Sequence, residues 1–394
     1  MATADARSAP GEGVMGGEHD RLAEDFRRRL RRVRAAMADR GLEGLLLYAS
    51  GQHNMLRMDQ VHYLSDVRVI GPHAVLLVPL DDEPRLLLTP RWDLARAREA
   101  TWLKEVETAD PEALAERVAQ AARGLSEPLG LCGREAMPVG FARALFAALG
   151  RTPVDAADLI PSLAVSRTPV ELERIRRAAA MADEGFRTLC EVARVGMREY
   201  ELAAEVDAAM HALGAEDNFG MIAAGAHNVA VRPPTDRRLD PGDVIISEIT
   251  PCYRGYLAQL CRTLILGKAT TLQREKHDLL LEAYGQGMAA ARPGRPSAEI
   301  ARAINGVIGR AGYAEYCRQP YMRTRGHGLG FGAVVPYDLT EDASPVLQKG
   351  MTFIIHPNQY IPETGYLMLG DTVVVGPDGP EPLTRTPQRL FSKE

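Results

Sequence analysis

The sequence predicts a protein of two mixed domains, a smaller α/β domain followed by a larger α+β domain. Three observations indicate this. The chain of 394 residues is long enough to bury two separate cores. Short apolar runs interrupted by Gly, Pro and Asp fill its first part, which is typical of buried strands. A clear helix start at Thr168 then opens a second series of helices and strands.

In the first domain, residues 20–40 carry apolar side chains at steps of four and three, with arginines on the opposite face. This spacing predicts an amphipathic helix. Further elements are expected as strands at 42–50, 73–80 and 84–90 and a helix at 111–124. The first 18 residues are rich in Gly, Ala and Ser, which predicts a disordered tail. We therefore place the first domain at 19–162.

The second domain, placed at 163–394, begins with a helix whose first residues can be predicted from the sequence. Thr168 is the expected N-cap, Pro169 occupies the first helical position and Glu171 completes a capping box. Further elements are expected as a helix at 198–213, strands within 219–267, helices at 271–291 and 297–311, and strands within 350–376.

The composition excludes several classes of protein. It is 46% apolar and 25% charged, as in globular domains, and a net charge of −5 gives no reason to expect nucleic-acid or membrane binding. No run of 18 apolar residues is present, and the N-terminal segment lacks the apolar stretch of a signal peptide. The five cysteines include no CxxC pair, which indicates free thiols. A cytoplasmic protein is expected.

Four motifs carry the functional signal: GDVIISEITPCYRGYLAQLCRT (242–263), GHGLG (326–330), MTFIIHP (351–357) and YLMLGDTVVV (366–375). Together they resemble the signature blocks of the creatinase/prolidase/methionine-aminopeptidase superfamily. The resemblance extends over residues ~20–390. It implies a creatinase-like N-terminal domain followed by a catalytic domain with the pita-bread fold.

Typical members of this superfamily hold two metal ions with Asp, Asp, His, Glu and Glu. The corresponding positions here are Glu248, Gln259, His327, His356 and Gly370. A second histidine expected after His327 falls near Val334 and is missing. Desolvating two divalent ions against a single carboxylate would cost many kcal/mol, so the sequence predicts that the dinuclear centre is absent.

Three readings remain open. In the leading one, no metal or other cofactor is bound, His327 and His356 form an acid–base pair, and Glu248 orients one of them or activates water. In the second, Glu248, His327 and His356 hold one Zn or Fe ion in a mononuclear hydrolase of the Xaa-Pro type or a lyase. In the third, the chain is a non-catalytic binding module.

The substrate is predicted from charge. In creatinase, which resembles this chain in having lost the ligand Asp residues and the metal, the carboxylates that bind guanidinium would map onto Cys261 and His356. Neither balances a cation, whereas several basic residues nearby suit an anion. The candidate substrate-binding residues are Arg232, Gln259, His227, Arg323, Arg325 and Asp371. We expect hydrolysis or elimination at a C–N bond of a small, non-peptide, carboxylate-bearing substrate.

The resemblance also implies a homodimer. In creatinase-like dimers the N-terminal domain of one subunit reaches the active site of its partner. The matching segment here, GQHNMLRMDQVHYLSDVR, contains His53, Arg57, His62 and Arg68, and one of these is the expected contributor.

Overall fold

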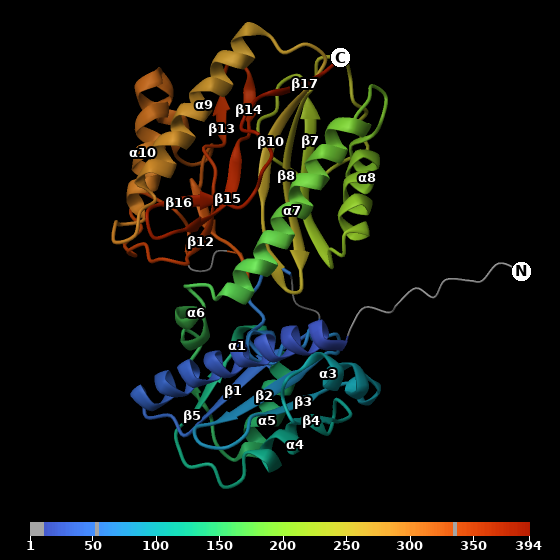
Figure 1. Cartoon of the computed structure of the whole chain (residues 1–394), viewed down its shortest axis with the longest axis vertical. Coiled ribbons are helices and arrows are strands. Elements are labelled where there is room, and N and C mark those ends of the chain that lie inside the picture. The colour runs from blue at the N-terminus through green and yellow to red at the C-terminus, as the bar shows by residue number, and fades with distance from the viewer. Residues whose placement is uncertain (1–11, 52–54, 334–336) are drawn as a thin grey trace, which may run out of the picture. The chain divides into compact units, whose positions relative to one another are not determined.

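The computed structural model describes residues 12–51, 55–333 and 337–394 (Figure 1). Their contacts divide them into two compact units: unit 1 ends at Ile160, and unit 2 runs from Pro161 to the C-terminus and also includes residues 55–59. The predicted boundary at 162/163 lies two residues beyond this division. His53 lies outside the described residues.

Unit 1 contains one mixed sheet with helices. Its elements are α1 (Glu12–Asp39), β1 (Gly44–Ala49), α2 (Gln60–Ser65), β2 (Ala74–Pro79), β3 (Arg85–Leu88), α3 (Leu94–Ala100), β4 (Glu105–Thr108), α4 (Leu114–Ala121), β5 (Leu129–Cys132), α5 (Val139–Leu149) and β6 (Val154–Asp155). The strand order is β4-β3-β2-β1-β5-β6, with β2 antiparallel to both of its neighbours. Helices α4 and α5 contribute Val118, Phe141 and Leu145 to its apolar core.

Helix α1 differs from the prediction at its start. It begins at Glu12, whereas residues up to 18 were expected to be a tail, and residues 1–11 lie outside the described part. From residue 20 onward the predicted apolar face is buried, with Phe26 and Val33 at 1% and 0% exposure. Arg29 is also fully buried there and donates to Asp25 Oδ2 and to the carbonyl oxygen of Tyr63.

Unit 2 is built on a larger sheet. After the linking helix α6 (Leu159–Leu163), its elements are α7 (Pro169–Val192), α8 (Glu199–Ala212), β7 (Asp217–Gly225), β8 (Val244–Tyr253), β9 (Tyr256–Leu257), β10 (Leu260–Leu266), α9 (Thr271–Ala290), α10 (Ala298–Ile308), β11 (Gly326–Gly328), β12 (Thr352–Ile355), β13 (Gln359–Ile361), β14 (Gly365–Leu367), β15 (Gly370–Val375), β16 (Pro380–Pro382) and β17 (Phe391–Lys393). The main path of the sheet is β11-β12-β15-β10-β8-β7.

The predicted start of α7 is confirmed. The Thr168 hydroxyl accepts a hydrogen bond from the Glu171 backbone amide, and the Glu171 carboxylate accepts one from the Thr168 amide. These bonds satisfy donors that the first turn of a helix leaves free.

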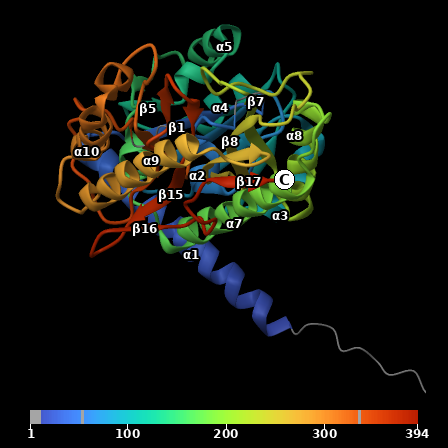
Figure 2. The same ribbon diagram turned by 90° about the horizontal axis from the view of Figure 1, so that it is seen from above.

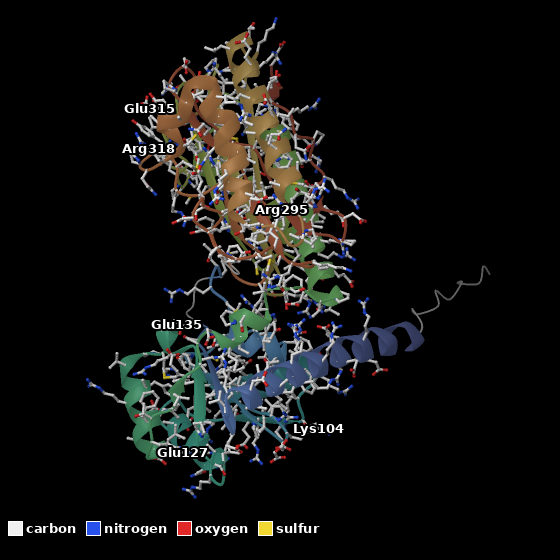
Figure 3. The ribbon with its side chains drawn as sticks, turned by 90° about the vertical axis from the view of Figure 1, so that its left-hand side faces the viewer. Lys104, Glu127, Glu135, Arg295, Glu315 and Arg318 are labelled. Atoms are coloured by element: carbon white, nitrogen blue, oxygen red, sulfur yellow. The ribbon has the colours of Figure 1, made fainter. Side chains whose placement is uncertain are left out.

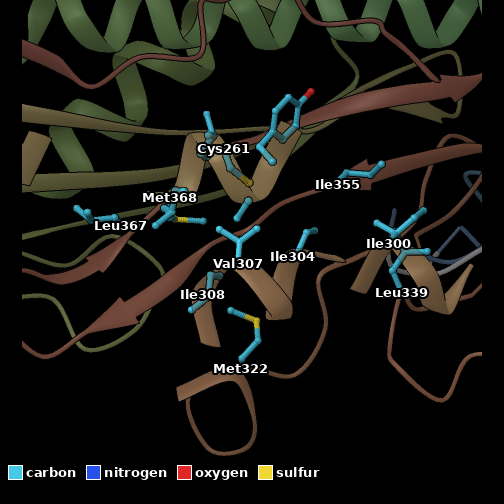
Figure 4. Close-up of a cluster of buried hydrophobic side chains, with 14 of the residues drawn as sticks. Cys261, Ile300, Ile304, Val307, Ile308, Met322, Leu339, Ile355, Leu367 and Met368 are labelled. Atoms are coloured by element: carbon cyan, nitrogen blue, oxygen red, sulfur yellow. The ribbon is translucent and has the colours of Figure 1, made fainter. Parts of the chain in front are cut away.

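The two faces of this sheet carry separate apolar cores, because side chains alternate along a strand. On β8, Ile245 and Ile249 pack with α7 and α8, whereas Val244 and Ile246 pack with α9 and α10. Figure 2 shows α9 beside α10, and Figure 4 shows the second core, in which Cys261 and Ile355 from the sheet meet Ile304 from α10. Glu248 is two residues beyond Ile246, so it belongs to the α9/α10 face.

Charged side chains occupy the exterior of both units. Figure 3 labels Lys104, Glu127 and Glu135 in unit 1 and Arg295, Glu315 and Arg318 in unit 2, all of them exposed. Among the helices of the described residues, none combines the length and the apolar character needed to cross a membrane.

Candidate active site

The sheet of unit 2 brings together the five positions that the motifs assign to metal ligands. Glu248 on β8 lies opposite Cys261 on β10, and Cys261 lies opposite Gly370 on β15. His356 follows the last residue of β12, which pairs with the neighbour of Gly370. His327 on the edge strand β11 pairs with Ile354 of β12. Gln259 directly precedes β10, and its backbone amide donates to Thr372 Oγ1 on β15. Positions that are 122 residues apart in the chain thus share one region of the sheet.

Two imidazoles form the centre of this region. The ring centroids of His327 and His356 are 6.0 Å apart. His327 Nδ1 lies 3.0 Å from the Gly328 carbonyl oxygen. Because a carbonyl only accepts, that nitrogen carries the proton and Nε2 keeps a lone pair. Burial lowers the pKa of His327 and, together with the neighbouring His327 ring, lowers that of His356 to about 3. Both rings are therefore neutral at pH 7.

His356 occupies the space that a side chain at position 370 would need. A Cβ added to Gly370 would lie 2.6 Å from His356 Cβ and 3.0 Å from the Ile355 carbonyl oxygen. Neither atom is the end of a flexible side chain, so the backbone would have to move. The two substitutions in the superfamily pattern are therefore coupled: with His356 in this place, position 370 accommodates only glycine.

Glu248 is the single carboxylate among the five positions, and it is partly exposed. Its side chain forms no hydrogen bond or ion pair within the part of the chain that is described. Burial raises its pKa to about 7, and the nearby positive charge of Arg323 opposes this rise. Near neutral pH the group therefore exists in both protonation states, as suits a residue that transfers protons.

Gln259 and Cys261 are buried beside Glu248. Gln259 is 2% exposed, and its Nε2 lies 3.7 Å from Cys261 Sγ. Burial raises the pKa of the Cys261 thiol, so it stays protonated and is not a nucleophile. No sequence motif pointed to Tyr366 as a site residue. Burial raises the pKa of its phenol, and the nearby Glu248 carboxylate adds to that rise.

Several residues predicted to bind substrate have structural partners instead. Asp371 is fully buried and accepts hydrogen bonds from Arg262, Thr384 and Gln388 at 2.7, 2.7 and 3.0 Å. Arg232 holds the buried carboxylate of Glu199 with two bonds of 2.6 and 2.8 Å. Both side chains are therefore held by partners within unit 2, and the proposed site does not include them.

The remaining candidates divide by exposure. Arg325 is 1% exposed and donates to Asn305 Oδ1, the Asn358 carbonyl and Gln359 Oε1, while its own carbonyl accepts from the His356 amide. It therefore holds the segment that carries His356. Arg323 is exposed and pairs with Asp338 at 2.7 Å. His227 is exposed, and its Nε2 lies 2.9 Å from the Pro362 carbonyl oxygen.

The structure locates the N-terminal candidates His62, Arg57 and Arg68 each within its own unit. His62 is 2% exposed, and its Nε2 lies 3.8 Å from Asp66 Oδ1 within unit 1. Arg57 is exposed and belongs to unit 2, and Arg68 lies in unit 1. A contribution of any of them to a partner's site stays a prediction.

Comparison with known proteins now identifies the family. Residues 173–377 match metallopeptidase family M24, and residues 29–163 match the creatinase/prolidase N-terminal domain. The chain belongs to family M24. This membership confirms the superfamily predicted from the motifs, and with it the fold class of a creatinase-like N-terminal domain and a pita-bread domain.

Relatives in this family are named as dipeptidases. The chain is 31% identical to the Xaa-Pro dipeptidase of Pyrococcus furiosus over 237 residues, which are 59% of this chain and 67% of the relative. It is 27% identical to the probable dipeptidase PepE of Mycobacterium tuberculosis over 383 residues, 94% of this chain and 97% of the relative. The crystal structure of PepE from Mycobacterium ulcerans superposes with a TM-score of 0.77 at 25% identity, covering 94% and 98% of the two chains.

These findings correct three expectations. A non-peptide substrate is contradicted because the relatives are named for the cleavage of dipeptides. Metal-independent chemistry and the absence of any cofactor are contradicted because M24 is described as a metallopeptidase family. Charge alone misled the prediction: a basic site suits the carboxylate of a dipeptide as well as that of any other small acid.

The residues of this chain nevertheless do not fit the metal centre that an M24 family implies. Among the described residues, no three His, Cys, Asp or Glu side chains gather closely enough to hold a metal ion, and this includes Glu248, His327 and His356. Where the pattern has four carboxylates, this chain has one carboxylate with a raised pKa, an amide, a neutral imidazole and a glycine.

The raised pKa of Glu248 predicts a pH-dependent stability. Between pH 4.5 and about 7, Glu248 keeps its proton in the native state but has lost it in the unfolded state. The stability that Glu248 contributes is therefore fully present below pH 4.5 and is lost as the pH rises through about 7. In Glu248→Gln we expect that loss, about 3 kcal/mol in the free energy of unfolding, to disappear, so that the variant is more stable than the parent at pH 8.

Urea unfolding at pH 4.5, 6 and 8 measures this difference. Glu282→Gln, at an exposed position of α9, is the matched control and should follow the parent at every pH. Identical pH dependence of Glu248→Gln and the parent would mean that the carboxylate is not desolvated in the folded state.

Proposed function

We propose that the chain is a hydrolase that cleaves small peptides, with Xaa-Pro dipeptides as the first candidates. The observation that carries the proposal is the placement of Glu248 and His327. Both are partly exposed on strands of one sheet, at positions that the motifs assign to metal ligands, in a family whose relatives are named as dipeptidases. Similarity over nearly the whole length of PepE supports the same substrate class.

Glu248 and His327 have the chemistry for proton transfer, and His356 lies beside His327 as a neutral ring. Glu248, with a pKa of about 7, takes a proton from water and returns one to the departing amine. His327 offers the Nε2 lone pair as a second acceptor. The His356 ring centroid lies 6.0 Å from that of His327, its backbone amide is held by the Arg325 carbonyl, and its ring stays neutral against Gly370.

The carboxylate of a dipeptide needs a positively charged partner in the site. Arg323 is suited to this because 59% of its side chain is exposed and its positive charge acts on Glu248, His327 and His356 alike. Its pair with Asp338 is partly exposed, so a substrate carboxylate can compete for the guanidinium.

The test is hydrolysis of Gly-Pro, Ala-Pro and Gly-Leu, with metal content measured in the same samples, before and after addition of Mn²⁺, Co²⁺ or Zn²⁺. We expect turnover, and a loss of about 100-fold or more in kcat for Glu248→Gln and His327→Ala, because each removes a proton-transfer group. Glu282→Gln should keep full activity.

Unchanged activity of both variants would remove these residues from the mechanism. Absence of turnover under every metal condition, with dipeptide binding still seen by calorimetry, would favour the non-catalytic binding module. A homodimer and a cytoplasmic location stay predictions. Sedimentation of the full chain tests the first.

A further inference from the structure

Unit 2 contains a recess of about 490 Å³ between α9 and the C-terminal segment 388–392, which includes the start of β17. Helix α9 contributes Arg274, His277 and Asp278 to its lining, and the segment contributes Gln388, Arg389 and Phe391. A recess of this size is suited to a small molecule. None of these residues belongs to the candidate active site.

His277 is the unusual member of the lining. It is 1% exposed, and within the described chain its Nε2 has no hydrogen-bond partner. Burial lowers its pKa to about 4, so the ring is neutral at pH 7. A buried polar atom without a partner is unfavourable, and a ligand that bonds to Nε2 would offset that cost.

Two arginines flank the recess, and neither forms an ion pair with any carboxylate that the structure describes. Arg274 donates to the Ala269 carbonyl oxygen at 3.3 Å, and the Arg389 guanidinium lies 4.9 Å from the centroid of the Phe391 ring. Asp278 is the acidic residue of the lining, so positive charge predominates. Leu281 and Phe391 provide an apolar wall beside these charges.

We propose that this recess binds a small organic anion. A carboxylate or phosphate head pairs with Arg274 and Arg389 and bonds to His277 Nε2, while an apolar body lies against Leu281 and Phe391. The proposal does not depend on the peptidase function, because no residue is shared between the two sites.

Calorimetric titration of the full chain in low salt tests this, with sodium benzoate as the probe for head and body together and inorganic phosphate as the probe for the head alone. We expect one benzoate per chain, and a Kd raised at least about tenfold in Arg274→Met and in Arg389→Met, because each loses a charge-assisted contact. Tighter binding of phosphate than of benzoate would identify a phosphate as the natural head group.

Two further variants separate binding from folding. His277→Phe fills the ring volume without a nitrogen, so it should weaken benzoate binding while leaving the melting temperature unchanged or higher. Arg310→Met removes an exposed charge outside the recess and should bind like the parent. The proposal is overturned if neither probe binds the parent, if the three recess variants bind as tightly as the parent, or if Arg310→Met weakens binding equally.

Discussion

Replacing Arg262 by methionine is expected to lower the free energy of unfolding by about 3–5 kcal/mol, since it leaves Asp371 as a buried carboxylate without its cation. Both side chains are fully buried. Arg262 donates to Asp371 Oδ1 at 2.7 Å and to the carbonyl oxygens of Gly370 and Thr386 at 2.8 and 2.6 Å. The variant therefore also removes this donor from the carbonyl oxygens of Gly370 and Thr386. Urea unfolding at pH 7 measures the loss.

Arg187→Met is the matched control for this substitution. Arg187 pairs with Glu184 and Glu191 on α7, but 54% of its side chain is exposed. A pair in solvent contributes less than about 1 kcal/mol, so its loss should be small. Equal effects of the two substitutions would show that the Arg262–Asp371 pair is not desolvated in the folded protein.

Restoring the family's carboxylate by Gly370→Glu is expected to destabilise the protein on the order of 5 kcal/mol. The new Cβ would meet His356 Cβ and the Ile355 carbonyl, which costs about 1–3 kcal/mol. The carboxylate would also enter a fully buried position, at a further cost of several kcal/mol. Thermal unfolding and urea unfolding, each with and without Mn²⁺, measure the result.

Two glycine variants dissect this effect. Gly370→Ala isolates the steric part and should lose about 1–3 kcal/mol. Gly285→Ala, in the exposed interior of α9 with open space around its Cβ, should instead gain about 0.5–1 kcal/mol from helix propensity. A Gly370→Glu protein that folds like the parent and binds Mn²⁺ tightly would contradict the coupling of His356 with Gly370.

The coupling also explains why this site cannot be assessed one position at a time. Each ligand position, taken alone, looks like the separate loss of one metal ligand. In the structure, His356 fills the volume that Gly370 leaves, and Arg325 anchors the backbone of His356 from a buried position. The site is a packed arrangement of its own, and its chemistry follows from neutral imidazoles and one carboxylate with a raised pKa.

The sequence by itself determined the family and many of the helices and strands, although α2, α3 and α5 were not predicted and α1 begins earlier than expected. Apolar periodicity and the Thr168–Glu171 capping box act over a few residues, so they can be recognised without tertiary contacts. The five ligand positions assigned from the motifs stay a prediction. The sequence did not determine the substrate class, because charge alone does not distinguish one small carboxylate from another.

Only the tertiary structure decided which polar side chains are available. Asp371 and Arg232 look like site residues in the sequence, but buried partners more than 30 residues away occupy them. The same holds for the pKa of Glu248, which depends on how much water the surrounding strands exclude. Burial and long-range pairing are properties of the packed sheet, and no local pattern of residues encodes them.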